Sequence, residues 1–231
     1  IEADLGGGLA TIQWVFDGYL LTLGALVLVG GSLGDLLGKR SVFIVGTAAF
    51  GVTSVLCGLA PSAFILILAR MGQGCAAALV VPASLALVNT LFSGKDRGKA
   101  IGAWSGLAGV FTAVGPFVGG LLVDTGTTGW RWVFLINIPL VVGAIALAVA
   151  TIPDVPGTRT QAPLRSQVDV LGGVLAVAGL AFVVGPLIEV AKLEVWVTIG
   201  LVMFGLILLA LLVVVENRRE HTQHPPPMVS L

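Results

Sequence analysis

Seven long apolar runs follow one another along the chain, and short polar or turn-forming stretches separate them. Each run is close to the ~20 residues that an α-helix needs to cross the hydrocarbon core of a bilayer. The runs do not alternate between apolar and polar positions, as the strands of a membrane β-barrel would. The pattern therefore predicts an all-α integral membrane protein with spans at 13–34, 41–59, 64–88, 100–123, 132–150, 170–188 and 195–215.

The composition supports these spans. Hydrophobic residues make up 57% of the chain, charged residues 10%, and the mean hydropathy is +1.06. A soluble domain carries about 25% charged residues, because its surface faces water. The chain has too few charges to cover such a surface, and its 32 glycines suit helices that pack closely in lipid.

The charges predict an orientation. The formal net charge is zero, so no overall field draws the chain to nucleic acid. By the positive-inside rule the basic loops face the cytoplasm, so residue 1 lies outside and the C-terminus inside the cytoplasmic membrane. An outer N-terminus without a signal peptide leads us to expect one more span before Ile1. The tail with His221, His224 and 225–227 is expected to lead into a further segment. The loops assigned to the cytoplasm hold Lys39, Arg40, Lys95, Arg97, Lys99, Arg159, Arg165, Arg218 and Arg219; the other side holds Arg131 and Lys192.

Nothing in the sequence predicts an enzyme. Residues 30–34 fit a nucleophile-elbow pattern, but their serine ends a helix of membrane-spanning length. Residues 72–77 imitate a dinucleotide fingerprint without a strand before them. Cys57 and Cys75 are interpreted as small packing residues rather than a disulfide or metal site. We therefore expect no catalytic residue, no metal and no cofactor.

The turn between the first two spans concentrates glycines and charges. Gly31 and Gly38 permit a tight turn and close helix approach. Asp35 can pair with a nearby cation such as Lys39 or Arg40, or cap the next helix. Two interpretations stay open: a turn that merely obeys the positive-inside rule, or a functional loop.

Two ionisable residues fall inside predicted spans. Arg70 lies roughly 9 Å from the outer end of the third span, at about 1.5 Å per residue. Such a residue marks a functional site, unless the long side chain reaches back to the interface. Asp17, near the outer side of the first span, is interpreted either as a protonatable site facing a cavity or as a residue in the wet interface.

The fourth span, 100–123, is rich in glycine. Spacings of four residues place several glycines on shared faces, which favours close helix packing. Pro116 removes a helical hydrogen bond and is expected to bend the span. Generic small-residue packing is the alternative to a functional motif. The residues concerned are Gly102, Gly106, Gly109, Gly115, Pro116, Gly119 and Gly120.

Together these elements resemble the major facilitator superfamily, and specifically its fourteen-span drug:proton antiporters. Residues 31–40 resemble the signature loop between the second and third helices. Arg70 with Gln73 and Gly74 is similar to the fourth-helix motif, and 109–120 resembles the antiporter motif of the fifth helix. Residues 13–19 and 130–139 (WRWVFLINIP) resemble stretches of the fourteen-span branch.

The resemblance covers nearly the whole chain and implies a major-facilitator-type helical bundle. Residues 1–151 would form the N-terminal bundle without its first helix, and 152–169 a cytoplasmic linker. Residues 170–215 would be a two-helix insertion between bundles, and 216–231 a cytoplasmic loop leading to a second bundle that the chain lacks.

The implied activity is proton-driven efflux of small lipophilic compounds, with the proton gradient as energy source and no cofactor. Asp17 and Arg70 would couple protons to transport, the loop 31–40 would gate, and Gly115–Pro116 would limit leak. Leu36 departs from the family pattern, which has a basic residue there. That leaves Lys39, Arg40 or Arg97 as partners of Asp35.

The expected partners are a small-molecule substrate, protons, the lipid bilayer and the missing C-terminal bundle of the same protein. Two other classes were weighed. One is a non-transporting membrane assembly or anchoring module with the same fold. The other is a membrane-embedded enzyme, against which the missing catalytic constellation argues.

Overall fold

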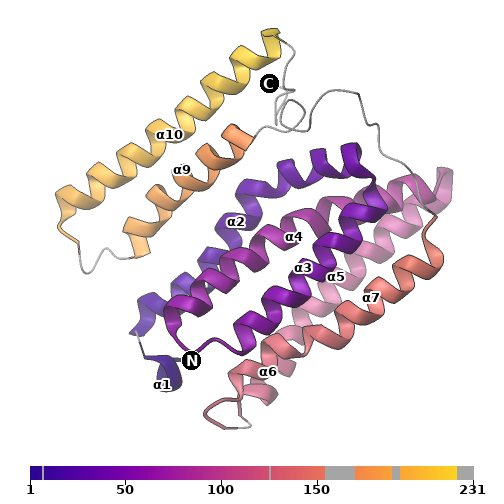
Figure 1. Cartoon of the computed structure of the whole chain (residues 1–231), viewed down its shortest axis with the longest axis horizontal. Coiled ribbons are helices and arrows are strands. Elements are labelled where there is room, and N and C mark those ends of the chain that lie inside the picture. Colours follow the sequence, from indigo (N-terminus) through magenta and orange to yellow (C-terminus); the bar gives the residue numbers. More distant parts are fainter. Residues whose placement is uncertain (7, 125, 154–169, 189–192, 223–231) are drawn as a thin grey trace.

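The structure, a computed structural model, describes residues 1–6, 8–124, 126–153, 170–188 and 193–222 (Figure 1). Within these ranges every regular element is a helix, so the predicted all-α class is confirmed. The linker residues 154–169 lie outside the described part, as do Glu189, Lys192 and the tail from 223 onward. The helices are α1 (Glu2–Leu5), α2 (Gly8–Leu37), α3 (Lys39–Gly58), α4 (Ala63–Leu91), α5 (Gly94–Val123), α6 (Trp130–Leu135), α7 (Asn137–Thr151), α9 (Val170–Ile188) and α10 (Val195–Thr222).

Six of the seven predicted spans correspond to helices that are long and apolar enough to cross a membrane, with α6 and α7 counted as one. The seventh corresponds to a shorter apolar helix, Gly172–Ile188 within α9. The helix bounds differ at several ends. The stretch 93–99, expected as a loop, forms the first turns of α5, and α10 continues beyond Val215 to Thr222.

The predicted span 132–150 is two helices, α6 and α7, joined at Ile136. Pro139 has no N–H to donate to the carbonyl of Leu135, so an unbroken helix would lack a hydrogen bond there. Pro139 instead lies in the first turn of α7, where the first N–H groups have no helical partner in any case.

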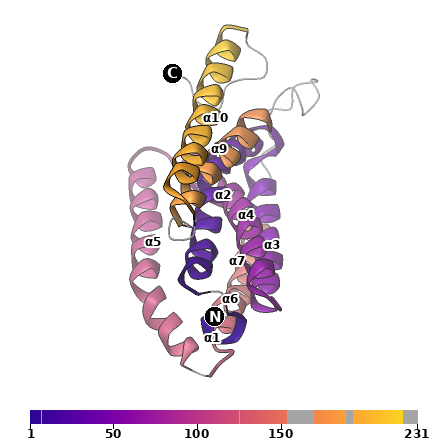
Figure 2. The same ribbon diagram turned by 90° about the vertical axis from the view of Figure 1, so that its left-hand side faces the viewer.

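α4 lies between α2 and α3 and packs closely against both (Figures 1 and 2). Glycines allow this approach. A Cβ on Gly30 of α2 would overlap the carbonyl oxygen of Ala78 in α4, and a Cβ on Gly74 of α4 would overlap Thr22 Oγ1. Small residues at such crossings let helix backbones approach in a membrane, where dispersion and hydrogen bonds replace the hydrophobic effect.

α9 and α10 form a pair that reaches the rest of the molecule through α2 (Figure 1). Gly179 and Gly205 lie where the two helices meet, and a Cβ on Gly205 would come within 2.8 Å of the Gly179 carbonyl oxygen. Towards α2, Gly173 faces Val29 and Gly185 faces the ring of Trp14. The pair therefore packs on the outside of the α2–α4 core, mainly through contacts between α9 and α2.

α5 has no buried residue, and its main contacts are with the neighbouring helices α4 and α6. No atom lies within 4 Å of a Cβ built on any of its glycines from Gly98 to Gly120. The close packing predicted for these glycines is therefore not formed within the described part of the chain. Pro116 lies inside α5, and Figure 2 shows the helix turning in the part nearest α6, as expected where a helical hydrogen bond is missing.

Candidate functional site

A cavity of about 680 Å³ lies among helices α2 to α7. This volume falls in the range of small-molecule sites, roughly 300–1,000 Å³. The wall is mostly apolar, and among the described lining residues Arg70 alone has a charged side chain. The lining residues are Ile1, Val15, Phe16, Tyr19, Phe50, Arg70, Gln73, Gly115, Pro116, Gly119, Val123, Trp130, Val133, Phe134 and Asn137.

Arg70 points into the bundle rather than back to the outer interface. Its Nε donates a hydrogen bond to the Val15 carbonyl at 2.8 Å, and Nη1 donates to Gln73 Oε1 at 2.6 Å. The guanidinium carbon lies 4.4 Å from the ring centroid of Tyr19 and 5.8 Å from that of Phe134, within the range of cation–π attraction. Of the two interpretations of Arg70, the structure therefore adopts the internal one.

Gln73 extends this polar contact across to α3. Its side chain is 1% exposed, and Nε2 donates to the hydroxyl of Ser54, itself fully buried, at 2.6 Å. The thiol of Cys57, also fully buried, lies 4.0 Å from Gln73 Oε1. Arg70, Gln73 and Ser54 thus form one buried hydrogen-bonded chain. Sequence reasoning missed Ser54, whose only signal is a hydroxyl within an apolar span.

Asp17 does not line this cavity, and no ion pair joins it to Arg70 in the described structure. The cavity wall takes Val15, Phe16 and Tyr19 from α2. Successive residues of a helix are turned by about 100°, so Asp17 faces roughly 200° away from Tyr19. Asp17 therefore faces away from the cavity that Arg70 lines, and the role of the two residues in proton coupling stays a prediction.

Part of the predicted antiporter motif does reach the cavity. Gly115, Pro116 and Gly119 line it together with Arg70, although they come from a different helix. Gly115 and Gly119 also border a second cavity of about 430 Å³ between α5 and the segment α6–α7. Gly109 and Gly120 line neither of these cavities. The fold thus brings the fourth-helix and fifth-helix motifs to one site.

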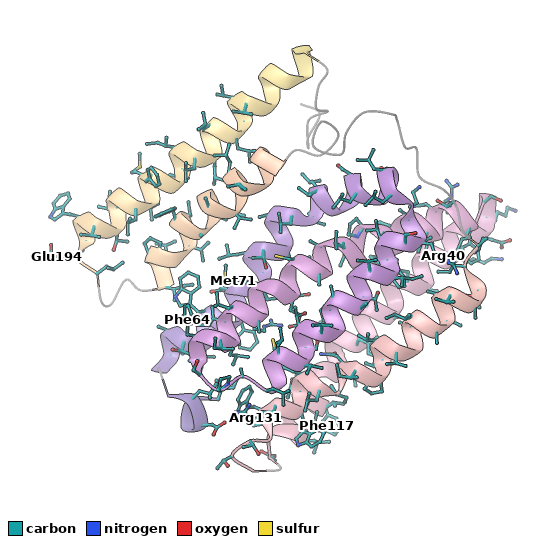
Figure 3. The ribbon with its side chains drawn as sticks, in the orientation of Figure 1. Arg40, Phe64, Met71, Phe117, Arg131 and Glu194 are labelled. Carbon is teal, nitrogen blue, oxygen red and sulfur yellow. The ribbon has the colours of Figure 1, made fainter. Side chains whose placement is uncertain are left out.

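The predicted gating loop, between α2 and α3, lies at the end of the bundle opposite to Arg131 (Figure 3). Gly38 separates α2 from α3 with a φ of 95°, a conformation that favours glycine and that makes this turn possible. Lys39 Nζ lies 3.8 Å from Asp35 Oδ1 and donates to Thr90 Oγ1 at 3.2 Å. A Cβ built on Gly31 would make only ordinary contact with Pro82, at 3.8 Å.

Arg40 and Arg97, the other proposed partners of Asp35, bind backbone carbonyls instead. Arg40 Nη2 donates to Val149 near the end of α7 at 2.9 Å, and Arg97 Nε donates to Phe92 at 3.1 Å. Cations at helix C-termini are favoured by the helix dipole. Lys39 is therefore the closest of the three proposed partners of Asp35.

A cluster that the sequence did not reveal lies at the end of the bundle where α1 and α6 meet. Arg131 Nη1 donates to the carbonyls of Gly58 and Ala60 at 3.0 and 2.9 Å, and Nη2 lies 3.3 Å from Asp4 Oδ2. Trp130, which is buried, donates from its indole N–H to the same carboxylate oxygen at 3.2 Å. Figure 3 shows Arg131 beside α6 and Arg40 at the far end of the bundle. These contacts join α1, the end of α3 and the start of α6 at one end of the cavity, which Trp130 also lines.

Apolar helices of membrane-spanning length around a largely apolar cavity with one internal arginine define a multi-pass helical membrane protein. A family model described as the Major Facilitator Superfamily matches residues 1–215. The chain belongs to this superfamily, which the sequence motifs had suggested.

Similar proteins carry names of antibiotic transport or resistance. The chain is 41% identical over 191 residues to the probable actinorhodin transporter of Streptomyces coelicolor. The matched region covers 82% of the chain and 32% of that protein. The chain is 38% identical over 182 residues to the tetracenomycin C resistance and export protein of Streptomyces glaucescens, covering 79% and 32%. It is 36% identical over 234 residues to the puromycin resistance protein pur8 of Streptomyces alboniger, covering 100% and 45%. The chain thus spans less than half the length of these curated relatives.

Proposed function

We propose that the protein containing this chain is a secondary active transporter that exports small lipophilic compounds across the cytoplasmic membrane in exchange for protons. The observation that carries this proposal is the 680 Å³ apolar cavity, where Arg70 and the glycines around Pro116 meet. The names of the similar proteins, which include an export protein, support the direction of transport. No enzymatic step and no cofactor belong to the proposal.

In this proposal residues 1–151 form most of one transport bundle, and 170–215 form a two-helix insertion beyond a cytoplasmic linker at 152–169. The segment 216–231 leads to a second bundle. Residue 1 lies on the outer side. The two bundles rock around a site near the middle of the membrane and expose it to each side in turn.

Asp17 is proposed as the proton site and Arg70 as the residue that senses the substrate cavity. Because Asp17 does not line the cavity, their coupling must pass through α2, on which Asp17 and Tyr19 are two positions apart. Tyr19 stacks on the Arg70 guanidinium, so a small rotation of α2 moves both groups together. The loop with Asp35 and Lys39 gates the inner end, and the bend at Pro116 limits leak.

The test uses the full-length protein in proteoliposomes with an imposed pH gradient. A fluorescent lipophilic substrate reports transport, and a pH-sensitive dye reports proton movement. Asp17→Asn is expected to abolish gradient-driven substrate movement, while substrate binding and membrane insertion remain. Asp124→Asn is the matched control, because Asp124 is exposed at the outer end of α5.

Normal gradient-driven transport by Asp17→Asn would remove Asp17 from the mechanism. Absence of any substrate-dependent proton movement in the unmodified protein would overturn the transport proposal itself. That second result is the one expected of a non-transporting membrane module with the same fold.

A further inference from the structure

The positive charge of Arg70 is compensated only by neutral groups within the described part of the chain. Its hydrogen bonds go to the Val15 carbonyl and to the amide oxygen of Gln73, and its faces meet the rings of Tyr19 and Phe134. No carboxylate of the described residues lies within ion-pair distance. Arg70 is only partly exposed, and a partly desolvated cation without an anion is unfavourable, so an anion that enters the site is favoured there.

Some N–H groups of the Arg70 guanidinium form no hydrogen bond with the described part of the protein. Nε and Nη1 each donate one hydrogen bond to the protein, and no bond from Nη2 is formed in the described structure. An arginine side chain presents a planar fork of N–H groups that matches the two oxygens of a carboxylate. The unfilled edge of that fork belongs to a residue that lines the cavity.

The fork is also held in place before any ligand arrives. Gln73 receives the Nη1 bond and is itself fixed by Ser54 at 2.6 Å, while Tyr19 covers one face of the guanidinium. Preorganised donors bind an anion without the entropy cost of ordering a long side chain. Beyond this polar point the wall is apolar, with Phe16, Phe50 and Val133 among the lining residues.

We propose that this cavity selects lipophilic molecules that carry a carboxylate or a similar anionic oxygen group. The anion binds the free edge of the Arg70 fork, and the apolar body of the molecule lies along the cavity wall. A lipophilic cation of the same shape is disfavoured, because its charge faces the fixed guanidinium at low dielectric constant. The inference rests on the proposed transport function and names the substrate class for that site.

A matched series of pyrene probes tests this selectivity on the purified full-length protein. Pyrenebutyric acid is the anion, pyrenebutanol the neutral form and pyrenebutylamine the cation, so the apolar body is constant. Binding is followed by pyrene fluorescence at neutral pH. The acid is expected to bind about tenfold more tightly than the alcohol, as a charge-assisted bidentate pair predicts, and the amine most weakly.

Arg70→Gln is expected to remove the tenfold advantage in affinity that the acid has over the alcohol. Arg70→Lys keeps the charge but loses the fork, so it retains only part of the advantage. Arg97→Gln is the matched control, because Arg97 is exposed at the inner end and binds only the Phe92 carbonyl. If Arg70→Gln does not fold, the inference is tested by the ratio of the dissociation constants of acid and alcohol, measured for the unmodified protein and for Arg70→Lys.

Equal binding of acid and alcohol by the unmodified protein, or an acid preference that survives Arg70→Gln, would overturn the inference. A second experiment measures whether pyrenebutanol moves together with protons in proteoliposomes. It tests the transport proposal independently of the selectivity for the acid. If the alcohol moves with protons but the acid has no advantage, only the selectivity fails. If nothing moves with protons but the acid binds through Arg70, only the transport function fails.

Discussion

α4 and α5 are consecutive helices of 29 and 30 residues, each rich in small residues and each with an internal proline. Nine residues of α4 are buried and none of α5 is. Gly74 in α4 lies against the backbone of α2, whereas Gly106 in α5 has no neighbour within 4 Å. Small residues in a membrane helix therefore permit close approach, but they do not by themselves say whether a partner is present.

The two helices differ in what surrounds them. α4 is held on two sides, by α2 and α3, and its buried Gln73 donates a hydrogen bond to Ser54 of α3. In α5, Gly115 and Gly119 line both cavities. Small residues there leave room in the cavities and do not form a helix–helix contact. Small residues thus allow tight helix packing in α4 and leave an accessible surface in α5.

The largest effect is expected from Gly30→Ala, which places a methyl group against the Ala78 carbonyl of α4. A backbone atom cannot rotate away, so the helices must separate, at a cost of about 3 kcal/mol, the upper part of the usual range for overpacking. Thermal melting of the purified full-length protein measures this loss. Gly24→Ala, in the same helix but with no atom within 4 Å, is the control and is expected to melt like the unmodified protein.

A smaller loss is expected from Gln73→Leu. The substitution leaves Arg70 Nη1 and the buried hydroxyl of Ser54 without their partner. An unsatisfied buried polar group costs about 1–3 kcal/mol, so we expect a destabilisation of about 2 kcal/mol in the same melting experiment. Ser84→Ala on the same helix removes only a bond to the nearby Val81 carbonyl and serves as control. Equal melting temperatures of Gln73→Leu and Ser84→Ala would show that the hydrogen bond between Gln73 and Ser54 does not stabilise the packing of α4 on α3.

The helices themselves could be predicted from the sequence, because the thickness of a bilayer fixes the length of an apolar run. The turn at Gly38 followed from the same pattern, and its positive φ gives the physical reason for glycine. A charge inside a span must find internal partners or reach the interface, and Arg70 has internal partners in Val15 and Gln73.

The rotation of each helix about its own axis could not be predicted. A membrane helix is apolar on its lipid face and on its protein face, so hydrophobicity does not show which side meets a neighbour. That is why the sequence left open whether Asp17 faces a cavity, and why Ser54 was overlooked. The membrane orientation and the roles of Asp17 and Arg70 in proton coupling stay predictions.

The smallest effect is expected at the start of α5, where Lys99 Nζ lies 3.1 Å from Asp96 Oδ1 and the two side chains are 79% and 73% exposed. A double-mutant cycle of Lys99→Ala and Asp96→Ala, read by thermal melting, is expected to give a coupling below about 0.5 kcal/mol, as for exposed pairs on one helix. Raised salt should reduce even this value, because water and ions screen both charges. A coupling above about 1 kcal/mol would mean that the first turns of α5 are packed and desolvated in the whole protein. The contrast with α4 would then hold only for the outer part of α5, where its glycines border the cavities.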